Sequence, residues 1–175
     1  MRKAALSILL LLSIAALTLA VQDPDWITYN SAEGRYNVSF PAQPKLSTQE
    51  SATVDGQKFL QYMASVQQPD VMYLVGYFDH VAGTIFSADR ARDAMLEAVK
   101  GTVISERTVS LNGNPGRELK VAAKLNANDY ILLVKFWDTE SRVYVLQVVY
   151  PKSGDSAAIN TKAAKYFDSF QIGKN

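Results

Sequence analysis

Hydrophobic and polar residues alternate with a period of two over much of the chain, which is the pattern of half-buried β-strands. The alternation is strictest over residues 35–40, directly after a turn-rich run at 30–34. These two segments, with the strand that starts at Trp26, predict a hairpin that has Gly34 at positive φ. Pro41 ends the second strand because proline cannot donate a hydrogen bond to a sheet ladder. The apolar positions of that strand, expected in the core, are Tyr36, Val38 and Phe40.

The same pattern predicts further strands along the chain. They cover residues 46–54, 58–66, 71–78, 103–111, 117–125, 130–137 and 143–150. The polar segment 46–54 is expected at a sheet edge, and Asp55-Gly56 supplies a tight turn after it. Segment 71–78 is apolar on both faces, which predicts cover on both sides of the sheet. The last two strands are long apolar runs and predict a central hairpin, whereas 112–116 reads as a loop.

Two segments change to a period of 3.6 and predict helices. The first has Ser87 as its N-cap and ends at Lys100, before Gly101. The second follows Pro151, with Ser153 or Asp155 as its cap. Their apolar faces are Ala91, Ala94, Met95, Ala98 and Val99, and Ile159, Ala163, Tyr166, Phe167 and Phe170. Long antiparallel strands with two amphipathic helices predict an α+β protein in which helices flank an antiparallel β-sheet.

The N-terminus has the composition of a secretory signal peptide. Two basic residues precede 17 residues that only three hydroxyl side chains interrupt. Small residues stand three and one positions before the bond between Ala20 and Val21, where signal peptidase would cut. We therefore expect residues 1–20 to be a cleaved signal peptide and 21–175 to be a single domain. An uncleaved anchor is the alternative, since this run is at the lower limit for a spanning helix.

Charge and cysteine content narrow the classes of partner. The chain of 175 residues has 18 basic and 17 acidic residues, and loss of the signal peptide leaves 16 basic against 17 acidic. A nearly neutral domain lacks the electrostatic attraction that nucleic acids require. We expect no nucleic-acid partner and no stable membrane insertion after cleavage. Without cysteine there is no disulfide, thiol nucleophile or thiolate metal site, and an exported chain of this kind is typical of the bacterial periplasm or medium.

The sequence contains no recognisable catalytic or metal-binding motif. Ser-His-Asp catalysis would depend on His80, the one histidine, and no nucleophile-elbow motif occurs. No His-x-x-x-His pair or calcium-binding loop is present. The pair Asp79 and His80 is the only weak candidate for a ligand. We therefore expect no enzyme activity, no cofactor and no metal site.

Two parts of the sequence resemble PsbP-like domains, the Mog/PsbP fold family that includes DcrB-like exported bacterial proteins. The resemblance lies in Trp26-x-x-Tyr29, Glu33 to Pro41 and Pro44, then Gly113-x-Pro115-Gly116-Arg117-Glu118, Val143 to Leu146, and Phe167 to Phe170. It implies an α/β/α sandwich around an antiparallel sheet and a non-enzymatic adaptor. Named relatives assist photosystem II or bind a small GTPase, and the resemblance transfers no functional residues.

Two functions remain open from the sequence. The first is an exported binding or assembly module that contacts an unknown envelope or secreted protein through a sheet face or a loop. The second is a binder of a small molecule or metal ion, with a pocket between the sheet and a helix. An exposed apolar patch would favour the first, and a closed pocket with convergent polar groups the second.

Overall fold

A computed structural model describes residues 26–53, 56–125 and 127–173, so the predicted signal peptide and its cleavage site between Ala20 and Val21 lie outside the described residues. The strands are β1 (Ile27–Ser31), β2 (Tyr36–Phe40), β3 (Lys45–Ala52), β4 (Lys58–Gln67), β5 (Met72–Asp79), β6 (Thr102–Leu111), β7 (Asn114–Leu125), β8 (Asn128–Asp138), β9 (Arg142–Pro151) and β10 (Gln171–Ile172). They form a seven-stranded sheet in the order β3-β4-β5-β9-β8-β7-β6 and a three-stranded sheet in the order β1-β2-β10. All strand pairs among the described residues are antiparallel, which confirms the predicted α+β class and the β8–β9 hairpin.

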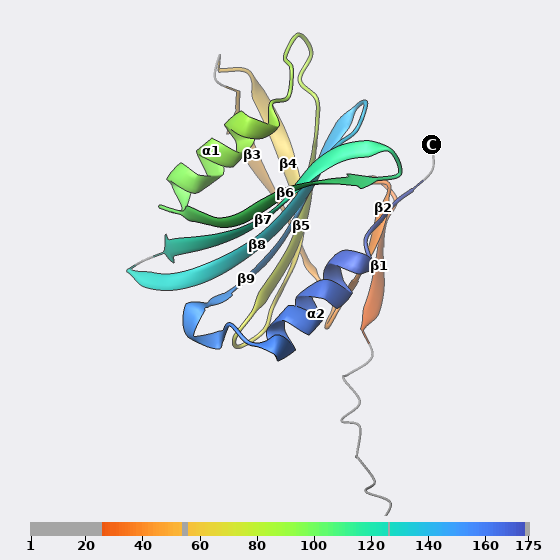
Figure 1. Ribbon diagram of the computed structural model, residues 1–175. Coiled ribbons are helices and arrows are strands. Elements are labelled where there is room, and N and C mark those ends of the chain that lie inside the picture. Colours follow the sequence, from red (N-terminus) through yellow and green to blue (C-terminus); the bar gives the residue numbers. More distant parts are fainter. Residues whose placement is uncertain (1–25, 54–55, 126, 174–175) are drawn as a thin grey trace, which may run out of the picture.

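Two helices, α1 (Ala88–Ala98) and α2 (Ala157–Asp168), pack on opposite faces of the larger sheet (Figure 1). Two adjacent residues of β9, whose side chains point to opposite faces of the sheet, show this division. Leu146 belongs to the cluster that contains α2 and the small sheet, while Val145 packs with the cluster under α1. In β5, the side chains on the α2 side are buried, whereas Leu74 and Phe78 on the other side are half-buried and line a groove. The cover predicted for 71–78 is therefore complete on one face only. Neither helix has the length and apolar character needed to cross a bilayer.

The core beneath α2 and the small sheet is aromatic. Phe40 and Tyr166 are fully buried, and their ring centroids lie 5.4 Å apart. Tyr73 packs edge-on to Tyr166 at 5.3 Å. The prediction that Phe40 lies in the core is therefore confirmed, and this contact links β2, β5 and α2.

Two chain reversals differ from the sequence-based expectation. The residue at positive φ after β1 is Arg35 (φ 52°), not Gly34. Gly34 is needed for another reason, since a β carbon there would lie 2.5 Å from the Tyr36 ring. After α1 the left-handed residue is likewise Lys100 (φ 47°) rather than Gly101. In both cases a glycine beside the reversal allows close packing, while its neighbour turns the chain.

The predicted loop at 112–116 is a two-residue turn. Asn112 and Gly113 both have positive φ, at 53° and 84°, which is the geometry of a tight hairpin. Strand β7 therefore begins earlier than expected and includes Gly116, where a β carbon would collide with the carbonyl of Phe136 on β8. Gly116, which favoured a loop in the sequence, lies inside a strand, and it is glycine because the approach to β8 admits no side chain.

The cap of α2 is neither of the two predicted candidates, Ser153 and Asp155, but the residue after Asp155. Ser156 caps the helix, accepting a hydrogen bond from the Ile159 amide at 3.4 Å. Asp155 instead bonds Lys120 of β7 at 2.8 Å and accepts from the Tyr150 hydroxyl at 3.1 Å. The carboxylate thus ties the start of α2 to the sheet. The predicted cap of α1, Ser87, is confirmed.

Candidate functional site

Asp79 and His80 lie at one end of the sheet but are held by separate partners. Asp79 Oδ1 accepts a hydrogen bond from Arg142 Nε at 2.6 Å. His80 Nε2 lies 2.8 Å from Asp138 Oδ1, and its amide donates to Ser141 O at 2.9 Å. Within the described part of the chain, no three metal-ligating side chains lie together. These contacts brace the turn between β8 and β9, and the two side chains do not converge on a common ligand position.

Arg142 connects this end of the sheet to the β1–β2 turn. Its Nη1 donates to the Glu33 carbonyl at 2.8 Å, and its guanidinium lies 4.3 Å from the centre of the Tyr77 ring. The Tyr144 hydroxyl donates to the Gly34 carbonyl at 2.8 Å. Segments more than 100 residues apart in sequence are therefore fastened together, which fixes Glu33 beside the larger sheet.

A recess of about 400 Å³ lies between the β1–β2 hairpin and strands β3 to β5. We call it the tyrosine recess; its main lining residues are Tyr29, Tyr36, Tyr62, Tyr77, Glu33, Leu46 and Thr48. Tyr36 and Tyr77 form its floor, at 5% and 4% exposure. Tyr62 stacks on Tyr77 with centroids 4.9 Å apart and an interplanar angle of 12°. Tyr29 and Tyr62 remain half-buried at the walls.

The tyrosine recess holds neutral phenols next to a carboxylate. Burial, followed by the negative charge of Glu33, raises the pKa of Tyr77 to about 12. Burial likewise raises the pKa of Tyr36 far above its ordinary value. Both hydroxyls are therefore protonated near neutral pH, and the floor of the recess carries no phenolate charge.

Strand β3, at one edge of the larger sheet, has no β-bulge, and its two charged residues, Lys45 and Glu50, lie outside its central segment. It pairs with β4 in continuous register, and its residues 46–49 are exposed and uncharged. The opposite edge, β6, has a register shift between Val103 and Ser105 and exposed charges at Glu106 and Arg107. Bulges and charges discourage pairing with another chain. The expected edge position of 46–54 is confirmed, and β3 is the edge open to a further strand.

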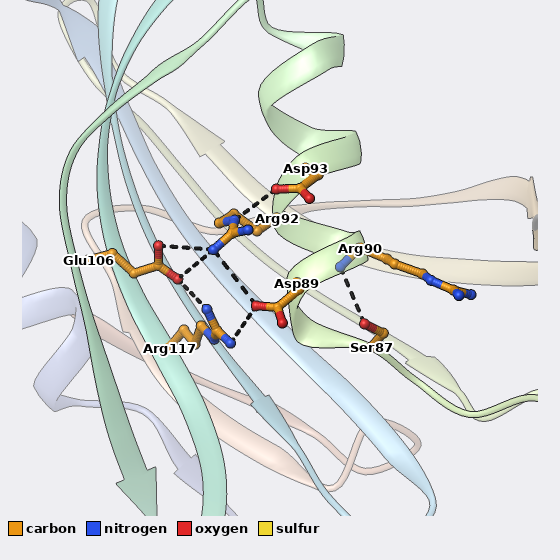
Figure 2. Close-up of polar contacts among 7 residues, drawn as sticks. All are labelled: Ser87, Asp89, Arg90, Arg92, Asp93, Glu106 and Arg117. Atoms are coloured by element: carbon orange, nitrogen blue, oxygen red, sulfur yellow. Dashed lines mark hydrogen bonds and ion pairs between the residues drawn. The ribbon is translucent and has the colours of Figure 1, made fainter.

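Ion pairs hold α1 on the sheet, as Figure 2 shows. Arg92 of α1 bonds Asp93 at 2.8 Å and reaches Glu106 of β6 at 3.3 Å. Arg117 of β7 bonds Asp89 of α1 at 2.6 Å and also pairs with Glu106. No residue of α1 is buried, so this network and a narrow apolar contact fix the helix over β6 and β7.

The strands beyond α1 are left partly open on that face. An apolar groove of about 290 Å³ runs between α1 and strands β4, β5, β8 and β9. Its principal lining residues are Met63, Leu74, Phe78, Phe86, Met95 and Phe136. We call it the apolar groove. Flexible methionines and aromatic rings are typical of surfaces that receive variable apolar groups.

Comparisons with known proteins identify the fold. No protein-family model and no curated protein matches the sequence. The solution structure of cyanobacterial PsbP (CyanoP) from Synechocystis sp. PCC 6803 superposes with a TM-score of 0.60 at 10% identity, covering 87% of this chain and 95% of that one. The fold is PsbP-like. At this identity the likeness shows the fold alone.

Two weaker matches have TM-scores too low to carry an argument. Protein PA94 of unknown function from Pseudomonas aeruginosa matches at 0.45, with 11% identity over 80% of this chain and 94% of that one. The immunity protein TplEi from the same species, complexed with a peptide, matches at 0.44, with 10% identity over 66% and 48%.

Sequence reasoning missed the tyrosine recess of this PsbP-like domain. Alternation placed Tyr36 in the core, which is correct, but it did not indicate that Tyr29, Tyr62 and Tyr77 line one recess with it. One signal was available, because 46–54 is a long polar segment in which Glu50 is the one charged residue. The recess itself has no local signal, because five strands build it.

Proposed function

We propose that this protein is an exported, non-catalytic binding module of PsbP-like α/β/α architecture. Its partner, an envelope or secreted protein, would supply an extended segment that pairs with the free edge of β3 as an additional strand. Residues 1–20 would direct export and be removed at the bond between Ala20 and Val21. The mature protein would then act in the periplasm or the medium. The open edge of β3 is the observation that carries the proposal.

An unpaired strand presents a row of backbone N–H and C=O groups that another strand can satisfy. Such strand addition derives affinity from the main chain and specificity from pockets that take alternate side chains. β3 meets both requirements. It has a free main-chain edge, and the tyrosine recess lies directly beside it and includes its own Leu46 and Thr48. Leu46 is 60% exposed, so a partner strand would also cover apolar surface.

Site-specific photo-crosslinking in the native host tests this proposal. A photoreactive residue at Gln49 samples the β3 edge, and the matched control at Thr108 samples the β6 edge; both positions are exposed. We expect one reproducible partner adduct from Gln49 and none from Thr108. Adducts from both positions, from neither, or only with a second copy of this chain would contradict docking of a partner at β3.

The apolar groove favours a second candidate function, the binding of a small apolar molecule between the sheet and α1. Its volume of about 290 Å³ is at the lower limit for small-molecule sites. Straight-chain alcohols should raise the melting temperature of the wild type but not of Met63→Trp, which fills the groove. Equal shifts in both proteins would count against this candidate.

A further inference from the structure

We infer that the tyrosine recess receives a cationic side chain, lysine or arginine, from the extended segment that adds to β3. This inference rests on the docking proposed above and names the chemistry of the partner. The occupant is thus a strand of another protein with a basic residue at a position whose side chain points to the recess. Three independent features of the recess support this choice.

The first feature is the arrangement of aromatic faces. Tyr62 and Tyr77 are stacked on one side of the recess. Tyr29 lines the other side, and its ring centroid lies 6.1 Å from that of Tyr36. Tyrosine faces carry negative electrostatic potential, and several together attract ammonium and guanidinium groups. The site already shows this preference, because the Arg142 guanidinium lies on Tyr77. Tyr62 and Tyr29 are the rings that remain partly exposed.

The second feature is the charge around the floor of the recess. Three charged groups act on Tyr77, namely Glu33, Arg142 and Asp79. Asp79 neutralises Arg142 through their 2.6 Å contact. The three groups together therefore carry one net negative charge, which belongs to Glu33, a lining residue of the recess. A cationic guest is complementary to this charge, whereas an acidic one would be repelled.

The third feature is distance. Neighbouring strands are about 4.8 Å apart, so a strand added outside β3 lies about two spacings from Tyr62 on β4. Its side chain must cross over Leu46 or Thr48 before it meets a tyrosine ring. Lysine and arginine have long apolar stems that can cover this surface with the charge at the far end. Short side chains would stop above β3.

Peptide binding to the protein purified from its host tests the inference. The probe is an acetylated and amidated ten-residue peptide of alternating threonine and valine with one central lysine, followed by fluorescence anisotropy. Its counterparts have arginine, norleucine or glutamate at the central position. We expect the lysine and arginine peptides to bind about tenfold more tightly than the norleucine peptide, and the glutamate peptide to bind most weakly.

Two variants separate charge from aromatic contact. Glu33→Gln should weaken binding of the lysine peptide about threefold and leave the affinity of the norleucine peptide unchanged. The matched control, Glu140→Gln, removes an exposed charge from another turn and should change the affinity of neither peptide. Tyr62→Leu should abolish the preference for lysine over norleucine. Equal affinities of the lysine and norleucine peptides would overturn the inference but leave strand addition intact. Absence of binding by every peptide, together with absence of the Gln49 adduct, would overturn both.

Discussion

Removal of one hydroxyl group should stabilise this protein. Tyr166 is fully buried, and no protein group among the described residues forms a hydrogen bond with its hydroxyl. Burial also raises the pKa of Tyr166 well above its ordinary value, so the group stays neutral and protonated. An unsatisfied buried polar group costs about 1–3 kcal/mol, and the void left by one oxygen atom costs only a few tenths of that. We expect Tyr166→Phe to raise the free energy of unfolding by about 1–2 kcal/mol.

Urea and thermal unfolding measure this change, and Tyr150→Phe is the matched control. Tyr150 is equally buried, but its hydroxyl donates to Asp155 Oδ1 at 3.1 Å. Loss of that bond to a charged group should lower stability by about 1–3 kcal/mol. For a domain of this size, the gain in Tyr166→Phe corresponds to a rise of about 2–8 °C in Tm. A Tyr166→Phe protein less stable than the wild type would refute the reasoning.

Three further predictions concern the core, a close strand approach and an ion pair. Phe40→Ala should lower the free energy of unfolding by about 3–5 kcal/mol; a loss under ~0.5 kcal/mol in urea titrations would show that the ring is not packed. Gly116→Ala should cost about 1–3 kcal/mol because its β carbon would collide with β8, whereas Gly154→Ala, with open space around it, should stay within about 0.5 kcal/mol in differential scanning calorimetry. Partial burial opposes ionisation of Glu118, but hydrogen bonds with Lys135 and its neighbours outweigh it and lower its pKa below the ordinary 4.5. The stabilisation that ionised Glu118 provides is therefore present above pH 4.5 and lost as pH falls through the lower folded-state pKa. Glu118→Gln should reduce the fall in the free energy of unfolding at acid pH. An unchanged dependence of that free energy on pH would exclude the ion pair as the cause of the fall.

The strands could be predicted because their periodicity is local. The β8–β9 hairpin is an example: each strand is a long apolar run, and a polar turn separates them, so the central position followed from burial on both faces. The two-residue strand β10 was not predicted because it is too short to show a period. It exists because the end of α2 places Gln171 and Ile172 beside Asn37 and Tyr36 of β2.

Glycine positions show the limit of local rules. Gly34 and Gly101 were expected to turn the chain, and Gly116 to lie in a loop. The structure uses all three for close approach, since a β carbon at each would lie under 3.0 Å from a neighbouring side chain or carbonyl. Whether a glycine serves conformation or packing depends on contacts with other strands, which a single segment does not encode.

The sequence by itself determined the α+β class, the main strands and both helices, because burial of alternate residues requires those periods. It also determined the polar character of β3. Only the tertiary structure decided which edge stays open and which side chains meet. Asp79 and His80 are adjacent in sequence but bond different partners, whereas Glu33, Tyr62 and Tyr77 are distant in sequence and line one recess. Strand order and the hairpin's fastening by Arg142 bring those residues together, and both depend on long-range pairing.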